Sequence, residues 1–543
     1  MEKIWLKQYP PGIPEFVDIP PLTLPQTLLA SKNKYPNQPA IVYLGAEITY
    51  AHLWNLVERF AEGLRKLGTQ KGDRVALILP NCPQVPIAIF GTLLMGGIVV
   101  QNNPMYTERE LKQQLGNARP KILITLNEFL DKVEPLLELP VLEKIIITHQ
   151  EEYALSATVP KKTKKKKIIR WCEFLNLNPS GLPWPDTHSE DTAFLQYTGG
   201  TTGIPKGAML NHKNIVANVA QNHVFYTQSV AGKDVWLSVM PFFHVLGLTI
   251  LLCWPLSIGG KVVIFPKVDL DLLIDAIARY KVTYMALVPT VYIGMINHPE
   301  VNRLDLTSLK YCVSGGAPIP AEIIDRFKSI TQCTIKECYG LTEASPGVLG
   351  TPDVAQAKRG KAGFPFPNTE IKVVNVETGE MEAPWGEKGE LVVRGPQVMS
   401  GYWENPEETK AVLIDGWLHT GDIVSMDKDG FICIEDRKKD LIIASGYNIY
   451  PREIEEVLFS YPKIKEAAVI GMPHPYRGET VKAFVVLKSG ESATEEEIFQ
   501  FCEERLAKYK VPKLVEFRDS LPKTGVGKIL RKILREEEAQ KSQ

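Results

Sequence analysis

The chain has 543 residues, enough for more than one domain, and its 44% hydrophobic and 23% charged residues are ordinary for a soluble globular protein. Its 62 Lys and Arg against 63 Asp and Glu leave a net charge of -1, which excludes a basic field for nucleic acid and the acidic excess of a disordered chain. The eight cysteines form no C-x-x-C pair and the nine histidines no zinc-spaced cluster, so we expect a reduced, cytoplasmic protein that binds no nucleic acid.

Helical and strand-like patterns alternate along the first third of the chain. Apolar residues recur at helical spacing over 53–64, and 74–79 has the pattern of a strand. Thr107 and Glu110 form a capping box ahead of another helix, and 121–125 has the pattern of the next strand. This alternation predicts an α/β fold with a parallel sheet covered by helices.

Two stretches raise the question of a membrane. Lys161–Lys167 contains six lysines, which favour a solvated loop, while peripheral contact with an anionic inner-membrane face stays an alternative. Val235–Gly260 is uncharged, but Pro241, Pro255 and several glycines interrupt it, so we expect buried core rather than a membrane span. Charges and prolines occupy the first eleven residues, where a secretory signal would be apolar, so secretion is not expected.

The segment Tyr197–Gly207, with sequence YTGGTTGIPKG, has the composition of a phosphate-binding loop. It contains four glycines, three threonines and one lysine. Glycines let the main chain approach a ligand, threonines add hydroxyl donors, and Lys206 adds a cation that polyphosphate oxygens can share. The standard G-x-x-x-x-G-K-[ST] loop is not present, because Lys206 is followed by Gly207. We interpret the segment as binding polyphosphate in preference to a flexible linker.

The alternating pattern continues beyond this loop and then changes. Strand-like residues lie at 261–265 and 283–288, with a helical pattern at 270–280 between them. Ser314–Pro318 follows a short apolar run, and its glycines predict a tight turn able to approach a flat ring. From 369 to 395 the residues alternate as in strands with one solvated face, which suggests an antiparallel subdomain.

Two short polar segments carry carboxylates. Tyr339–Glu343 brings an aromatic ring, a hydroxyl and the carboxylate of Glu343 together, and this acid could hold magnesium. The start of a helix explains its Thr/Glu pair equally well. Gly416–Asp422 ends in an acid that could accept two hydrogen bonds from a ribose diol, although a turn is the better explanation of Thr420–Asp422 taken alone.

Past Asp436 the pattern restarts on a smaller scale. A helix is expected after Pro451, strands at 467–470 and 481–487, and a helix that begins with a second capping box of Thr494 and Glu497. We therefore expect two domains, at 1–435 and 436–543, the second a small mobile α+β domain.

The segment Pro522–Lys528 places a glycine-flanked lysine near the C-terminus. Ile529 stands where a P-loop needs Ser or Thr, so the segment is not a P-loop, and a solvated turn is the plain alternative. A lysine on a mobile loop can also enter an active site late and neutralise charge as it develops.

In this order the motifs resemble the acyl-activating, adenylate-forming enzymes, and among these the chain is similar to the bacterial long-chain fatty-acid–CoA ligases. Such enzymes join a carboxylic acid to AMP, release pyrophosphate, and then let the thiol of coenzyme A displace AMP. ATP, Mg²⁺ and coenzyme A are thereby implied. The resemblance covers nearly the whole chain and rests on Tyr197–Gly207, Tyr339–Glu343, Gly416–Asp422, Asp436–Asp440, Gly446–Pro451 and Pro522–Lys528.

The resemblance also implies the roles of single residues. Asp422 and Arg437 would bind the ribose, Thr198 and Glu343 would lie near magnesium, and Lys528 would bridge the carboxylate and the α-phosphate. The residues implied to bind the β- and γ-phosphates are Thr198, Gly199, Gly200, Thr201, Thr202, Gly203 and Lys206. Those implied for the rest of the nucleotide are Gly315, Gly316, Ala317, Tyr339, Gly340 and Thr342. Gly200 stands where many relatives carry serine, so no side-chain hydroxyl contact is expected there.

The resemblance further implies that one active site performs two reactions. The second domain would rotate about Asp436 and exchange the Lys528 loop for the face that carries Gly446 and Tyr447. Pro241–Leu248 is similar to the segment that opens the acyl pocket in fatty-acid ligases. Within it, the sequence leaves two roles for His244, a gate for the substrate or a packed imidazole.

Cations, rather than an acid or a base, would perform this chemistry. A carboxylate and an α-phosphate are both anionic, so their reaction is slow in water. Lys206, Lys528 and a magnesium ion at Glu343 would reduce the repulsion and stabilise the in-line transition state. No general base is required, because a carboxylate is already ionised near neutral pH.

Alternatives to a long-chain substrate stay open at this stage. The chain could adenylate a medium-chain or aryl acid, load a carrier protein instead of coenzyme A, act as a luciferase-like oxygenase, or be a non-catalytic nucleotide or lipid sensor. A homodimer is one oligomeric state that the sequence leaves open.

Overall fold

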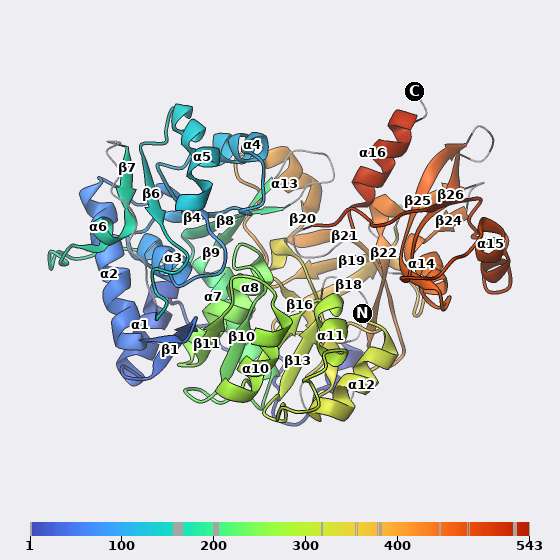
Figure 1. Cartoon of the computed structure of the whole chain (residues 1–543), viewed down its shortest axis with the longest axis horizontal. Helices are drawn as coiled ribbons and strands as arrows, with labels where there is room; N and C mark the ends of the chain where they lie inside the picture. Colours follow the sequence, from blue (N-terminus) through green and yellow to red (C-terminus); the bar gives the residue numbers. More distant parts are fainter. Residues whose placement is uncertain are drawn as a thin grey trace. The chain divides into compact units, whose positions relative to one another are not determined.

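The computed structural model describes residues 3–155, 167–198, 206–315, 319–352, 355, 357–376, 378–379, 383–444, 447–474, 476, 478–524 and 529–541. The chain divides into two compact units (Figure 1). The larger unit contains Trp5–Glu370 and Val393–Leu418, and the smaller contains Met1–Ile4, Ile371–Val392 and His419–Gln543. Each unit is described by itself.

The first sheet of the larger unit follows from the βαβ pattern of the sequence. All neighbouring strands in it are parallel except the last pair, which is antiparallel. The predicted strands at 74–79 and 121–125 are confirmed to within a residue at each end. In spatial order the described strands are β7 (Ile168–Arg170), β6 (Lys144–Thr148), β5 (Ile122–Leu126), β3 (Arg74–Ile78), β4 (Ile98–Gln101), β8 (Thr192–Thr198) and β9 (Lys206–Asn211).

Helices connect these strands and bury their apolar faces on the sheet. The helix predicted around 53–64 is present, and the capping box of Thr107 and Glu110 forms as expected. Leu111 and Leu115 of that helix pack with Ile78 and Val100 of the sheet in one buried cluster. The helices of this region are α2 (Tyr50–Lys66), α3 (Gln84–Leu94), α4 (Glu108–Ala118), α5 (Leu130–Val133) and α6 (Trp171–Leu175), with short 3₁₀ turns η1 (Ile4–Gln8), η2 (Asn127–Phe129) and η3 (Glu134–Glu138).

A second, mostly parallel sheet contains an unexpected hairpin. The first two strands of the chain do not join the first sheet; β1 pairs in parallel with β11, and β2 continues the edge antiparallel to β1. The described strands in spatial order are β14 (Ile335–Glu337), β13 (Tyr311–Ser314), β12 (Tyr284–Leu287), β10 (Val235–Ser238), β11 (Lys261–Ile264), β1 (Pro39–Tyr43) and β2 (Ala46–Thr49). The associated helices are α1 (Leu24–Lys34), α7 (His212–Phe225), α10 (Leu270–Tyr280), α11 (Pro289–Ile296) and α12 (Ala321–Thr331).

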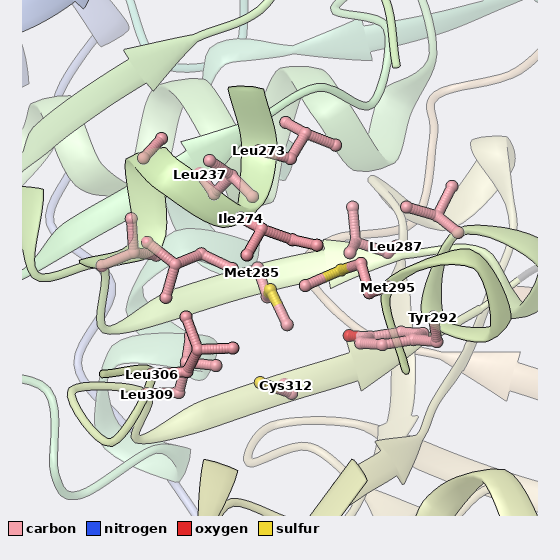
Figure 2. Close-up of a cluster of buried hydrophobic side chains, with 14 of the residues drawn as sticks. Leu237, Leu273, Ile274, Met285, Leu287, Tyr292, Met295, Leu306, Leu309 and Cys312 are labelled. Atoms are coloured by element: carbon pink, nitrogen blue, oxygen red, sulfur yellow. The ribbon is translucent and has the colours of Figure 1, made fainter. Parts of the chain in front are cut away.

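One face of this sheet carries a large apolar core. Figure 2 shows Met285 and Cys312 of adjacent strands beneath Ile274 of α10 and Met295 of α11, and all four are buried. Each Leu, Ile or Met side chain buried in this way contributes about 2 kcal/mol relative to exposure.

The long uncharged stretch 235–260 is buried core, as predicted. It forms β10, α8 (Val245–Leu248), one π turn (Thr249–Cys253), α9 (Trp254–Ser257) and the turn into β11. Leu252 and Trp254 are fully buried. Within the described ranges, no helix combines the length and the apolar character needed to cross a bilayer.

Among the described residues, four short strands, one 3₁₀ turn and one helix complete the larger unit. The pairs β15/β16 and β16/β17 are antiparallel. The elements are β15 (Tyr339–Gly340), the 3₁₀ turn η5 (Thr342–Ala344), β16 (Gly347–Gly350), β17 (Phe364–Pro365), α13 (Pro406–Val412) and β20 (Leu413–Ile414).

The strands predicted between 369 and 395 are present as β18 and β19, and they share a sheet with antiparallel strand pairs. β21 pairs antiparallel with both β20 and β22. The sheet comprises β18 (Glu370–Val374), β19 (Gly389–Arg394), β21 (Trp417–Met426), β20 and β22 (Ile432–Arg437).

The rest of the smaller unit is an α+β structure, as expected. The capping box of Thr494 and Glu497 forms, and α14 begins at Pro451. Its sheet contains β24 (Tyr447–Ile449), β23 (Ile442–Ala444), β26 (Gly478–Leu487), β25 (Ile464–His474) and β27 (Leu514–Phe517). The other elements are the 3₁₀ turn η6 (Lys438–Asp440), α14 (Pro451–Phe459), α15 (Glu495–Glu503) and α16 (Arg531–Lys541).

Candidate active site

The loop end of the β8/β9 hairpin holds the two described ends of the glycine-threonine segment. Thr198 and Lys206 are direct partners in the antiparallel register, and the Thr198 hydroxyl donates to the Lys206 carbonyl at 3.5 Å. Behind them, the ring of Tyr197 covers Gly207, where a Cβ would lie 3.1 Å from the ring. The hairpin therefore fixes where residues 199–205 leave and rejoin the sheet, while those residues themselves lie outside the described part of the chain.

Residues 399–403 run along β9 and bring a tyrosine to this end of the sheet. The Met209 amide donates to the Gly401 carbonyl at 2.9 Å, and the Trp403 amide donates to the Gly207 carbonyl at 2.7 Å. Tyr402, 7% exposed, lies between these contacts, with its ring centroid 5.6 Å from Nζ of Lys206.

Glu343 is anchored to the same segment. Its Oε1 accepts a hydrogen bond of 2.7 Å from the Tyr402 hydroxyl, and its carbonyl accepts one of 2.8 Å from the Met399 amide. Tyr402 thus contacts both Lys206 and Glu343, two residues for which the sequence predicts catalytic roles.

The ammonium group of Lys206 has a carboxylate partner. Its Nζ donates to Oε2 of Glu408 at 2.5 Å, and the lysine side chain is 17% exposed. Glu408 lies in the first turn of α13, where its own amide donates to the side chain of the N-cap Asn405 at 3.2 Å. The helix start therefore holds a negative charge directly against Lys206.

The segments expected to border the nucleotide run side by side. The Cys338 amide donates to the Ser314 carbonyl at 3.3 Å, so Gly315 lies beside the start of Tyr339–Glu343. A Cβ at Gly340 would overlap the carbonyl oxygen of Pro346, which explains the glycine there. Thr342 opens the one-turn 3₁₀ helix η5, so the segment starts a helix and also presents polar side chains.

Pro241–His244 lies against the first sheet. His244 caps α8, because its Nδ1 accepts a hydrogen bond of 3.2 Å from the Leu246 amide. The side chain of Gln196, two residues before Thr198 on β8, donates to the Phe243 carbonyl. The predicted acyl segment and the predicted phosphate loop thus meet at the same strand.

Within the smaller unit, Asp422 and Arg437 form a pair across β21 and β22. They are register partners, and Nε of Arg437 lies 2.7 Å from Oδ1 of the buried Asp422. The Asp422 amide donates to the Thr420 hydroxyl at 3.1 Å. The turn suggested for Thr420–Asp422 is wrong, because these residues lie inside a ten-residue strand.

Several predicted site residues lie outside the described part of the chain. Of the pair Gly446 and Tyr447, only the main chain of Tyr447 is described, as the first residue of β24. Lys167 is the one described residue of the lysine run. The residues not described are Gly199, Gly200, Thr201, Thr202, Gly203, Gly316, Ala317, Gly446, Lys528 and Lys161–Lys166.

Sequence reasoning missed Tyr402 and Glu408. The Asn405–Pro406 pair carries a helix-start signal that could have predicted α13. The contact of Glu408 with Lys206, 202 positions earlier, could not be predicted from any local pattern.

Family models match most of the chain. A model described as AMP-binding enzyme matches residues 28–403, and one described as AMP-binding enzyme C-terminal domain matches residues 453–528.

Relatives of the same length show similarity along the whole sequence. The long-chain-fatty-acid–CoA ligase of Bacillus subtilis (strain 168) is 44% identical over 553 residues, covering 99% of each chain. That of Escherichia coli O157:H7 is 39% identical over 560 residues, covering 99% of this chain and 98% of its own. The crystal structure of ATP-bound MatB from Rhodopseudomonas palustris superposes with a TM-score of 0.86 at 29% identity, covering 96% of this chain and 100% of that one.

Proposed function

The chain belongs to the AMP-binding enzyme family, and on that premise we propose that it ligates a long-chain fatty acid to coenzyme A. The reaction consumes ATP, passes through an acyl-adenylate, and releases AMP and pyrophosphate. The observation that carries this proposal is the 39–44% identity, over nearly full length, to relatives that bear this activity in their names.

Thr198 and Lys206 are proposed to bind the β- and γ-phosphates together with residues 199–203. The hairpin supports this role, because it presents a hydroxyl and an ammonium group at one point of the sheet. A cation there reduces the repulsion between the attacking carboxylate and the phosphates.

Glu343 and Thr198 are proposed to hold magnesium. A carboxylate and a hydroxyl supply the oxygen donors that this ion prefers, and the hydrogen bond from Tyr402 fixes the orientation of the carboxylate. Magnesium bound there would neutralise phosphate charge as the pyrophosphate leaves.

The remaining nucleotide contacts are proposed from the resemblance. Asp422 is proposed to bind the ribose, with Arg437 orienting its carboxylate. Gly316, Ala317 and Tyr339 are proposed to border the adenine. Further nucleotide contacts are proposed for Gly315, Gly340 and Thr342.

Lys528 is proposed to contact the carboxylate and the α-phosphate during adenylation. The carboxylate attacks the α-phosphorus, the bond to the pyrophosphate oxygen breaks, and no proton is transferred. In the second step the coenzyme A thiol loses its proton to solvent, its sulfur attacks the acyl carbon, the bond from that carbon to the AMP oxygen breaks, and AMP leaves. A small domain at 436–543, turning about Asp436, is proposed to exchange Lys528 for Gly446 and Tyr447 between the steps.

Pro241–Leu248 is proposed to border the acyl chain, with His244 at its centre. The support is its position beside β8, where Gln196 contacts Phe243 just before Thr198. A carboxylate near the phosphate loop would leave its alkyl chain to extend along this segment.

Pyrophosphate release, measured with octanoate, laurate, palmitate and benzoate, tests the function directly. We expect release with each fatty acid, the highest kcat/KM for palmitate, and thioester formation only when coenzyme A is present. Preference for benzoate or octanoate would overturn the long-chain substrate and leave the ligase chemistry intact. Adenylate formed without any thioester on addition of coenzyme A would point to a carrier-protein acceptor.

Cytoplasmic placement with peripheral membrane contact through Lys161–Lys167 is a further part of the proposal. Co-sedimentation with anionic lipid vesicles, compared with neutral ones, tests the contact, and light scattering tests for a homodimer.

A further inference from the structure

Three buried side-chain amides hold the main chain of the predicted acyl segment. Asn81, 3% exposed, follows β3 and binds this main chain through both polar atoms of its amide. Its Nδ2 donates to the Met240 carbonyl at 2.9 Å, and its Oδ1 accepts from the Phe242 amide at 2.8 Å. The Asn81 side chain thus provides the donor and the acceptor that the main chain of a neighbouring strand would otherwise provide.

The other two amides come from adjacent strands in register. Gln101 on β4 and Gln196 on β8 are direct register partners, 4% and 2% exposed. Gln101 donates to the Phe242 carbonyl at 3.1 Å, and Gln196 donates to the Phe243 carbonyl. We call Asn81, Gln101 and Gln196 the amide clamp.

The start of α8 also holds the segment. The His244 amide donates to the Pro241 carbonyl at 3.0 Å. Gly247 lies so close to the same carbonyl that a Cβ there would overlap it. The main chain from 240 to 244 is therefore fixed both by the clamp and by the start of α8.

We propose that the amide clamp positions the acyl-binding segment and thereby sets which carboxylic acids the enzyme accepts. This rests on the proposed function. With the main chain fixed, adjustment to the alkyl chain falls to the side chains of Phe243 and His244, both partly exposed, whereas Phe242 is buried. Because Gln196 shares strand β8 with Thr198, the clamp also fixes the segment relative to the end of the phosphate hairpin.

A purely structural role for these amides is the alternative, and Gln84 provides a matched control. Gln84 is also fully buried and donates to the Thr148 hydroxyl and the His149 carbonyl at 2.8 and 2.7 Å, at the end of β6. In both Gln84 and Gln196, Oε1 is buried without a hydrogen-bond partner among the described residues. The side chains of Gln84 and Gln196 therefore differ mainly in the groups to which they donate hydrogen bonds.

The test compares Gln101→Met, Gln196→Met and Gln84→Met, which keep side-chain length and remove the amide. Pyrophosphate release is measured with octanoate, laurate, palmitate and benzoate at saturating ATP, and KM for ATP is measured separately. Leaving one buried carbonyl unpaired should raise KM for the preferred acid about tenfold in the two clamp variants. The ratio of kcat/KM between acids should shift, while KM for ATP stays near the parent value.

Gln84→Met should lower the melting temperature without changing that ratio. The proposal is overturned if both clamp variants keep the parental ratio, or if Gln84→Met changes it equally. It is also overturned if both clamp variants fail to fold while Gln84→Met folds, because the amides would then serve stability alone. A parent that prefers benzoate contradicts the fatty-acid function instead, and the clamp is then tested by the benzoate-to-octanoate ratio.

Discussion

The hydroxyl of Tyr402 donates a 2.7 Å hydrogen bond to Oε1 of Glu343, across 59 positions of the sequence. The same ring lies 5.6 Å from the ammonium nitrogen of Lys206. Tyr402 thus links the residue proposed to hold magnesium with the lysine proposed to bind phosphate, although no local pattern marks it.

Tyr402→Phe should impair the use of ATP. Without the hydroxyl, the Glu343 carboxylate loses its fixed orientation, and we expect kcat/KM for ATP to fall about tenfold. ATP–pyrophosphate exchange at several magnesium concentrations measures this effect. Tyr43→Phe is the control, because it removes a hydroxyl that donates to the Gln150 carbonyl at 3.0 Å, far from these residues in sequence. Equal ATP kinetics in the two variants would contradict the role of Tyr402.

Glu408→Gln should strengthen the binding of ATP. The Glu408 carboxylate lies 2.5 Å from Nζ of Lys206, so it competes with phosphate oxygens for the same ammonium group. A partly exposed pair of this kind is worth up to about 1 kcal/mol, so we expect KM for ATP to fall about threefold. Glu407→Gln, which alters the highly exposed neighbour, should leave KM unchanged. A rise in KM in Glu408→Gln would show instead that Glu408 holds Lys206 in its working position.

Lys528→Ala should slow adenylation more than thioester formation. The lysine is proposed to neutralise charge at the α-phosphate, and removal of one such donor costs about a hundredfold in rate. Rapid-quench measurement of acyl-AMP formation gives the first step, and thioester formation from supplied acyl-AMP gives the second. Lys523→Ala, which loses only a 2.7 Å contact with Glu466, is the matched control. Formation of acyl-AMP at the parental rate by Lys528→Ala would refute its assignment.

His212 should make the stability of the larger unit depend on pH. The imidazole is 2% exposed, and burial lowers its pKa from 6.5 to about 4. Its Nδ1 accepts a hydrogen bond of 3.2 Å from the Leu24 amide. Below pH 6.5 the imidazole of His212 is protonated in the unfolded chain, whereas in the folded protein it stays neutral down to about pH 4. The free energy of unfolding should therefore decrease by about 3 kcal/mol as the pH falls across this window.

His212→Asn should remove that pH dependence while keeping an acceptor for the Leu24 amide. Denaturant unfolding at several pH values between neutrality and pH 4 measures the difference from the parent. His188→Asn changes an exposed imidazole and should behave like the parent. An identical pH profile for His212→Asn and the parent would show that His212 takes up its proton without loss of stability.

Local signals in the sequence predicted local structure well. The capping boxes of Thr107 with Glu110 and of Thr494 with Glu497 are both present, because their hydrogen bonds join residues only three apart. Strand and helix patterns between 53 and 125 were confirmed for the same reason, since each depends on the burial of one face of one element.

Pairings between distant residues could not be predicted in this way. The hairpin β1/β2 joins the second sheet through β11, more than two hundred positions later, where parallel register is set by packing rather than by a turn. Lys206 was selected for its motif, but the contact of Glu408 with it depends on how α13 docks. The clamp residue Asn81 resembles any polar residue that follows a strand, and only the fold shows what it binds.

The amide clamp forms its hydrogen bonds with main-chain carbonyl and amide groups, which do not depend on the side chain. A substitution at Phe243 keeps the main-chain carbonyl at that position, so the hydrogen bond from Gln196 is retained whichever side chain replaces the phenyl ring. Laboratory evolution or natural divergence can therefore change the side chain proposed to border the acyl chain at this position, while the main-chain path of the segment stays the same.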